Sequence, residues 1–303
     1  RGDADVRRDA EGRPPNDCGA GHMPSPPWAP PGAGGRKRKA GGFYKILAFI
    51  SLLGVFVFWV LELIDFAALV IALGVVPPEV ADRTVTVSLG LGQVAGPGAV
   101  AYFLFLAAML FISLGVLLRE DLGRLGVSLK KLTDGEVPAM GGGNGFLMIA
   151  ELFLAILFID IVWSMLLEVF GLGITVPASI AEADTWELMW GLAEASVMEE
   201  LLSRVLLIGV PLYFAHRASG GLEERGLLSH LWGGGFDWTP AVVLLVFTSS
   251  LIFGFLHLGW TWTKVPPTFI SGLAFAYLYV RKGLHASILF HFAFDYLTIM
   301  PTY

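Results

Sequence analysis

The sequence predicts an all-α protein, a polytopic transmembrane helix bundle of about seven spans preceded by a disordered N-terminal tail. Hydrophobic residues make up 55% of the 303 residues and charged residues only 15%, below the roughly 25% charged that is typical of soluble domains. Several apolar segments approach or exceed the roughly 20 residues that cross a bilayer as a helix. The segments are continuously apolar and do not alternate every second residue, which favours helices over a membrane barrel.

The N-terminal segment, residues 1–42, differs in composition from the rest of the chain. It is rich in Gly, Pro, Arg and Asp and shows almost no apolar periodicity. Such a segment cannot bury enough apolar surface to offset the entropy lost on ordering, so we expect a disordered tail before one membrane domain at residues 43–303. The single cysteine, Cys18, lies in this tail, which excludes an intramolecular disulfide and a cysteine-ligated metal cluster.

The apolar spans follow one another along the domain. The first runs from about residue 43 to residue 76, where two prolines stop the helix. Between the second and third spans, residues 119–137 mix charged and apolar side chains and are expected to lie at the membrane interface. The other six spans are expected at about 98–118, 146–172, 186–215, 240–260, 266–281 and 284–300.

Lys and Arg in the short loops predict the orientation of the bundle. Most of them precede the first span or follow the second, fourth and sixth spans, whereas Arg83 and Lys264 fall on the opposite side. Because loops rich in Lys and Arg stay in the cytoplasm, we expect a cytoplasmic N-terminus and an external C-terminus.

The fourth span holds three ionisable side chains, Glu199, Glu200 and Arg204, in an otherwise apolar segment. Ionisable groups inside a bilayer are costly, so each one calls for a partner or a function. Glu200 and Arg204 lie one helical turn apart, which predicts a structural ion pair. Glu199 projects about 100° away in an α-helix and has no partner there, which suits a general base acting on water. Hydrogen bonding between helices is the alternative explanation for both carboxylates.

The fifth and seventh spans carry histidines. His257 follows Phe253 by one turn near the end of its span and, taken alone, also fits an interfacial anchor. His291 and Asp295 are one turn apart in the seventh span, where they form either a local hydrogen bond or part of a site. His285 lies six residues before His291, near two basic residues, and is expected at the membrane interface. The spans hold five other acidic residues, which we expect to make contacts between helices: Glu62, Asp65, Glu151, Asp160 and Glu168. Asp160 is the one among them to test for a function.

Four of these side chains come from three helices and are expected to face the interior of the bundle, where convergent titratable groups suggest an active site. Two reactions fit them. In one, Glu199 and His257 activate a water that attacks a peptide carbonyl, while His291 and Asp295 stabilise the oxyanion. In the other, Glu199, His257 and His291 bind Zn²⁺, whose water is the nucleophile.

Three strings, EELLSR, FGFLH and HFAFD, occur in this order on three apolar spans. They resemble the EExxxR, FxxxH and HxxxN/D motifs of the CPBP (Abi) family of CAAX proteases and bacteriocin-processing enzymes. The resemblance covers about residues 186–300 and implies an intramembrane endopeptidase similar to the type II CAAX prenyl endopeptidases. The family is often labelled metalloprotease, but the resemblance implies a glutamate protease without metal, so no cofactor is favoured and zinc ranks second. It assigns Glu199 and His257 to water activation, His291 and Asp295 to the oxyanion, and Glu200 with Arg204 to structure.

The last motif ends in Asp295, whereas the type II prenyl endopeptidases that it resembles look to have Asn at this position. An ionised Asp cannot donate a hydrogen bond to an oxyanion. Asp295 therefore either carries a proton or orients His291, and the second role costs less free energy.

Two non-enzymatic functions are possible on the same bundle, an immunity or scaffold protein and a proton-coupled transporter. A scaffold does not need Glu199, His257 and His291 together, and a transporter more often shows paired broken helices, which this sequence lacks. The expected partners are membrane lipid and a membrane-embedded or lipidated peptide, such as a prenylated CAAX peptide or a bacteriocin precursor, and no nucleic acid.

Overall fold

The structure is a computed structural model that describes residues 84–87, 92–133, 143–173, 178–183, 185–219 and 226–299, with single positions between 42 and 56. The predicted tail and most of the predicted first span, with Glu62 and Asp65, lie outside the described residues, and the division into tail and membrane domain stays a prediction.

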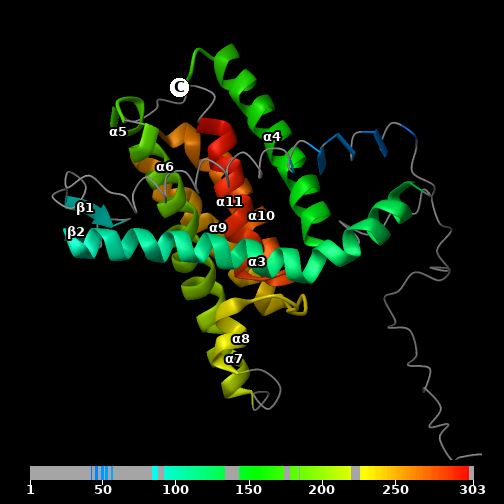
Figure 1. Ribbon diagram of the computed structural model, residues 1–303. Helices are drawn as coiled ribbons and strands as arrows, with labels where there is room; N and C mark the ends of the chain where they lie inside the picture. The colour runs from blue at the N-terminus through cyan, green and yellow to red at the C-terminus, as the bar shows by residue number, and fades with distance from the viewer. Residues whose placement is uncertain are drawn as a thin grey trace, which may run out of the picture. The chain divides into compact units, whose positions relative to one another are not determined.

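Helices dominate the described residues, which confirms the all-α fold class (Figure 1). One small antiparallel hairpin adds to it, in which β1 (Thr84–Val87) pairs with β2 (Gly92–Ala95) and Thr84 lies opposite Ala95. Its first strand has the sequence TVTV, and β-branched residues favour strands. The helices are α3 (Pro97–Thr133), α4 (Gly145–Val169), α5 (Ala178–Ala181), α6 (Thr185–Glu194), α7 (Val210–Ala218), α8 (Leu227–Trp232), α9 (Pro240–Leu256), α10 (Val265–Arg281) and α11 (Leu284–Ile299).

Local sequence signals explain where two of the long helices begin. Asn144 precedes α4, and its side chain accepts a hydrogen bond from the backbone N–H of Leu147 at 3.3 Å. Thr239 precedes α9 and accepts from the backbone N–H of Val242 at 3.3 Å, with Pro240 at the first helical position. Both are preferred arrangements at helix N-termini because they satisfy backbone donors that have no intrahelical partner.

Helix α3 is longer than the predicted second span. The prediction separated a span at 98–118 from an interfacial segment at 119–137, but the helix continues without a break to Thr133. No proline interrupts residues 98–133, and the glycines within them cost only about 1 kcal/mol each in a helix. The charged segment is therefore a continuation of the spanning helix.

The predicted fourth span is one long helix of mixed type, residues 185–218. Between α6 and α7 it contains two π-helical segments, η3 (Ala195–Glu199) and η4 (Leu201–Gly209). Pro211 lies just beyond η4 and cannot donate the hydrogen bond of a regular helical turn, which favours an irregular ladder before it. The hydroxyl of Ser203 also donates to the backbone oxygen of Glu199 within this region.

Helix α11 lies at the centre of the bundle, drawn in red in Figure 1. It packs against α3, α4, α6, α8, α10 and both π-helical segments. All its side chains from Leu284 to Phe294 are buried. A residue on α11 is therefore well placed to meet side chains from several other helices.

Helices α9 and α10 form a tight pair next to α11. A Cβ atom at Gly254 would lie 3.1 Å from the Phe269 side chain, and one at Gly272 would lie 3.3 Å from the Cα of Ser250. The absence of side chains at these two glycines allows the helix backbones to approach closely. This packing fixes the end of α9, where His257 lies.

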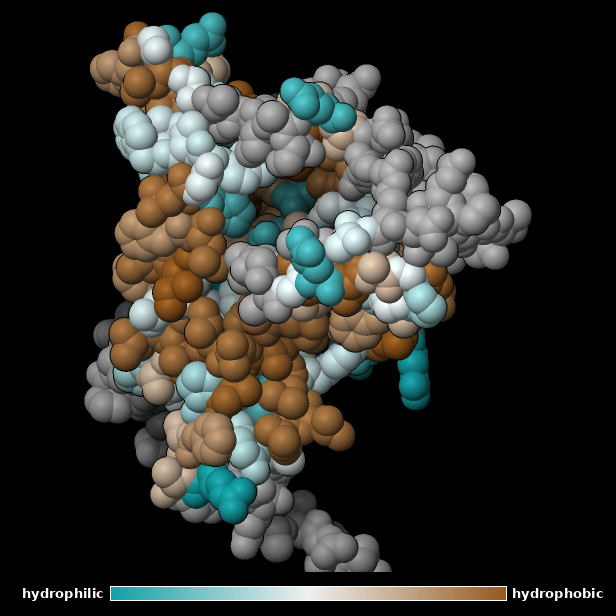
Figure 2. Space-filling model, turned by 90° about the vertical axis from the view of Figure 1, so that its left-hand side faces the viewer, coloured by the Kyte–Doolittle hydropathy of each residue, from teal (hydrophilic) through white to brown (hydrophobic). Residues whose placement is uncertain are grey.

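The apolar helices make this chain an integral membrane protein. Among the described residues, three helices are long and apolar enough to cross a membrane: residues 97–128, 145–169 and 240–259. Large apolar side chains such as Phe158 and Met165 on α4 and Leu244 on α9 are exposed, as expected of surfaces that face lipid. Figure 2 shows hydrophobic residues spread over one face of the molecule. The number of seven crossings and the cytoplasmic N-terminus stay predictions.

Candidate active site

Glu199 ends the first π-helical segment and lines a pocket of about 230 Å³. Single π-helical turns inside α-helices are rare and occur frequently at functional sites. One carboxylate oxygen of Glu199, Oε2, is buried and has no hydrogen-bond partner among the described residues. Buried carboxylate oxygens without a partner are uncommon, so Glu199 is the first residue to examine for a function.

Two histidine nitrogens approach this carboxylate. Glu199 Oε2 lies 3.9 Å from Nε2 of His257 and 3.8 Å from Nε2 of His291. Both distances are too long for a direct hydrogen bond. They leave room for a small ligand such as a water molecule that bridges the groups.

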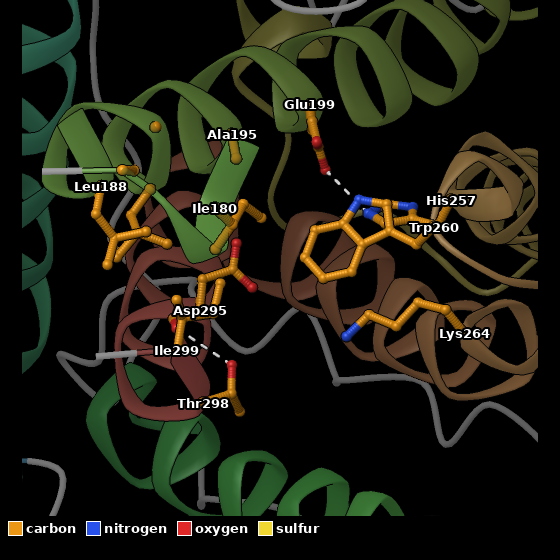
Figure 3. A pocket seen from close by; sticks show the side chains of 13 residues that line it. Ile180, Leu188, Ala195, Glu199, His257, Trp260, Lys264, Asp295, Thr298 and Ile299 are labelled. Carbon is orange, nitrogen blue, oxygen red and sulfur yellow. Dashed lines mark hydrogen bonds and ion pairs between the residues drawn. The ribbon is translucent and has the colours of Figure 1, made fainter. Parts of the chain in front are cut away.

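His257 lies where α9 ends and a short 3₁₀ turn begins (His257–Gly259). Its Nδ1 lies 2.9 Å from the backbone oxygen of Phe253, one of the last carbonyls of α9. The carbonyl can only accept, so Nδ1 donates and Nε2 keeps the orientation that faces Glu199. The dashed line in Figure 3 joins these two side chains across the pocket.

His291 is buried and lies between carboxylates. Its Nδ1 is 3.0 Å from Oε1 of Glu200, and its Nε2 is 3.2 Å from Oδ2 of Asp295. The ring stacks on Phe275 with centroids 4.4 Å apart and an interplanar angle of 16°. These contacts fix the position and the plane of the imidazole ring.

The predicted ion pair is present and fully buried. Arg204 Nε lies 3.1 Å from Oε2 of Glu200, and the same oxygen accepts a hydrogen bond from the hydroxyl of Ser287. Arg204 also donates to Oγ of Ser249 at 2.8 Å, and its guanidinium lies 5.1 Å from the centroid of the Phe253 ring. Glu200 therefore accepts three hydrogen bonds, from Arg204, Ser287 and His291, whereas Glu199 beside it has none on its buried oxygen.

The pocket combines these polar groups with apolar walls. Glu199, His257 and Asp295 line it, with Trp260 and Lys264 on one side and Thr298 at the end of α11 (Figure 3). The space-filling view in Figure 2 shows a hollow with hydrophilic residues at its bottom. Its apolar lining includes Ile180, Leu188, Leu192 and Ile299.

The residues named for zinc do not fit a metal site in this arrangement. Both nitrogens of His291 lie next to carboxylate oxygens, Nδ1 at 3.0 Å from Glu200 and Nε2 at 3.2 Å from Asp295. Across the described segments, no group of three or more His, Cys, Asp or Glu side chains is arranged to hold a metal ion.

The structure thus brings together all four predicted catalytic residues, with Glu200 and Arg204 beside them. Sequence reasoning missed Ser287, although Ser287, His291 and Asp295 recur at intervals of four along one face of α11. It also missed Lys264, which was counted only as a loop charge but lines the pocket.

Two further predictions concern His285 and Asp160. His285 is fully buried in the bundle and stacks on Trp232 with ring centroids 5.9 Å apart, and its position at the membrane interface stays a prediction. The glycine before α11 turns the chain and directs His285 into the bundle instead of toward the surface. Asp160 on α4 has a buried oxygen without a hydrogen-bond partner in the described part of the chain, so it stays the acid to test.

Comparison with known proteins identifies one family. Residues 180–297 match the family described as Type II CAAX prenyl endopeptidase Rce1-like, which confirms the resemblance predicted from the three motifs. The match runs from α5 into α11 and includes Glu199, His257, His291 and Asp295. No curated protein and no solved structure matches the chain.

Proposed function

Since residues 180–297 of this chain belong to the Rce1-like type II CAAX prenyl endopeptidase family, we propose that it is an intramembrane endopeptidase whose Glu199 and His257 activate a water molecule. The observation that carries the proposal is the carboxylate of Glu199, held in a pocket between the Nε2 atoms of two histidines. Family membership supports the endopeptidase activity, and the geometry supports the assignment of roles.

The proposed reaction begins with a water held between Glu199 and His257. Glu199 takes a proton from the water as its oxygen attacks the scissile carbonyl carbon, and the C=O π electrons move to the carbonyl oxygen. The proton then passes from Glu199 to the leaving amine as the C–N bond breaks. The Nε2 atom of His257 accepts a hydrogen bond from the same water and orients it, because Nδ1 of this ring donates to the backbone of Phe253.

His291 and Asp295 complete the proposed site. Nε2 of His291 lies 3.8 Å from Glu199 and 3.2 Å from Asp295, which places this nitrogen next to the point of attack. We propose that this nitrogen stabilises the negative charge that develops on the carbonyl oxygen. The distance between Asp295 and His291 supports an orienting role for Asp295, since its carboxylate accepts from the ring.

The apolar lining supports a hydrophobic peptide as substrate. Ile180, Leu188, Leu192 and Ile299 offer aliphatic contacts around the catalytic groups. Burial of aliphatic side chains against such a wall contributes roughly 25 cal/mol per Å² of apolar surface. A C-terminal CAAX peptide, with aliphatic residues after a prenylated cysteine, has the matching chemistry.

Cleavage of a synthetic peptide by the purified protein in liposomes tests the proposal. Acetyl-Cys(farnesyl)-Val-Ile-Met should release the tripeptide Val-Ile-Met. The Glu199→Gln variant should lose about 10²- to 10⁴-fold in kcat, because the amide cannot take a proton from water. Its thermal unfolding should match the parent, since Gln keeps the shape of the side chain.

Two results would contradict the proposal. Full turnover by the Glu199→Gln variant would remove the general base. Loss of activity with a strong chelator, followed by recovery with zinc, would favour the metal-dependent alternative.

A further inference from the structure

One cation lies in the pocket beside the acidic and histidine side chains. Lys264 belongs to the turn between α9 and α10 and lines the pocket with Glu199 and His257. Figure 3 shows its side chain directed into the pocket from the side of Trp260, opposite Leu188. The same turn, residues 257–264, thus carries both the water-orienting histidine and the ammonium group.

The ammonium of Lys264 forms no close ion pair in the described structure. None of the described carboxylates lies within 4.0 Å of its Nζ, although Glu199 and Asp295 line the same pocket and Asp160 of α4 interacts with Lys264 electrostatically. Its Nζ lies over the ring of Trp260, 5.3 Å from the ring centroid. An aromatic ring attracts and positions a cation without neutralising its charge.

From this arrangement we infer that Lys264 binds a carboxylate of the substrate, specifically the free C-terminal carboxylate of the peptide. The inference rests on the proposed function and adds a specificity-determining residue to it. Without Lys264, a substrate carboxylate entering the pocket would meet the acids Glu199 and Asp295, which repel it. The ammonium of Lys264 offsets this repulsion and offers a charge-assisted hydrogen bond.

The size of the pocket favours binding of a C-terminal carboxylate close to the scissile bond over binding of a carboxylate far from it along the peptide. The cavity of about 230 Å³ is below the roughly 300–1,000 Å³ of pockets that hold drug-sized ligands. Glu199 and Lys264 line this same cavity, so a short segment of peptide can join the bond cut at Glu199 to the carboxylate bound at Lys264.

Three probe peptides in liposomes test the inference. The first is acetyl-Cys(farnesyl)-Val-Ile-Met as free acid, the second is the same peptide as C-terminal amide, and the third is this amide with Glu in place of Met as its last residue. The parent protein should cleave the free acid about tenfold to hundredfold better in kcat/KM than the first amide, the range expected for a lost charge-assisted hydrogen bond. The Lys264→Met variant should bring the free acid down to the level of the amide, and Lys264→Arg should restore most of the preference. Lys131→Met, which changes an exposed lysine on α3, is the matched control and should keep the preference.

The outcomes separate the two proposals. Poor cleavage of the amide ending in Glu identifies the C-terminal carboxylate as the group bound, whereas cleavage at the level of the free acid overturns that choice in favour of a side-chain carboxylate. Equal cleavage of acid and amide by the parent, or an unchanged preference in Lys264→Met, overturns the inference and leaves the proposed function in place. Failure of the parent to cleave all three peptides overturns the proposed function and the inference with it.

Discussion

Two buried ionic clusters in this molecule differ in how completely their carboxylates are satisfied. In the first, which we call the strut, Asp121 of α3 contacts Lys282 Nζ at 2.9 Å and 3.0 Å and accepts from the backbone N–H of Gly145 at 2.9 Å. In the second, the catalytic cluster, Glu199 leaves one buried oxygen without a hydrogen bond. A polar group that is buried and unsatisfied costs free energy, so it persists where function requires it.

The comparison also separates the two adjacent glutamates of the long helix. Glu200 accepts from Arg204, Ser287 and His291 and resembles Asp121 of the strut. Glu199 faces the pocket, with its Oε2 3.8 Å and 3.9 Å from the Nε2 atoms of two histidines, and it resembles neither Glu200 nor Asp121. The satisfied carboxylates of these two clusters hold helices together, and the unsatisfied carboxylate of Glu199 is available to a ligand.

Among the variants that test this comparison, the largest effect is expected from His257→Ala. This change removes the group that orients the water, so kcat should fall roughly 10²-fold or more. The side chain is 18% exposed and makes one hydrogen bond, to its own helix, so the unfolding temperature should change little. Turnover and thermal unfolding assays on the same variant check this. If the unfolding temperature falls together with turnover, His257 has a structural role like the residues of the strut.

The next effect is expected from Arg204→Met, which leaves Glu200 buried without its cation. Removing one partner of a buried ion pair costs about 3–5 kcal/mol. Denaturant unfolding in detergent measures this loss. Adding Glu200→Gln to Arg204→Met should recover part of it, because the unpaired charge is then gone; a double variant less stable than the single one would contradict the pairing.

Lys282→Met should destabilise by about 2–3 kcal/mol, less than Arg204→Met, because Lys282 is 13% exposed and water offsets part of the loss. Turnover per folded molecule should stay at the parent value, since the strut shares no residue with the pocket. A fall in kcat without a fall in stability would show that the comparison between the two clusters is wrong.

The smallest effect is expected from Ser287→Ala, which removes one hydrogen bond to the Glu200 carboxylate. Hydrogen bonds to charged groups contribute about 1.5–3 kcal/mol, and Arg204 and His291 remain, so a loss of about 1.5 kcal/mol is expected. Ser287→Thr keeps the hydroxyl and serves as the control in the same unfolding experiment. Equal losses in both variants would attribute the effect to packing and not to the hydrogen bond.

Much of the fold and part of the site follow from local sequence patterns. Continuous apolar segments predict α4 and α9 within a few residues, because backbone groups in lipid must be satisfied within a helix. A spacing of four residues predicts the contacts of Glu200 with Arg204 and of His291 with Asp295, since residues one turn apart share a face.

Local patterns fail where the helix itself is irregular or where a contact joins distant segments. The π-helical segments around Glu199 depend on Pro211 and on how the helix packs, and a regular α-helix was assumed. The burial of His285 depends on its contact with Trp232, which lies far from it in the sequence, and its basic neighbours do not predict this contact.

By itself, the sequence determined that this chain is helical and membrane-embedded, and which side chains share a helix face within each motif. Only the tertiary structure decided that Glu199 meets His257 and His291, that Glu200 and not Glu199 is fully paired, and that Lys264 faces the same pocket. The physical reason is that helical periodicity fixes neighbours three and four residues apart, whereas contacts between helices depend on how closely their backbones pack.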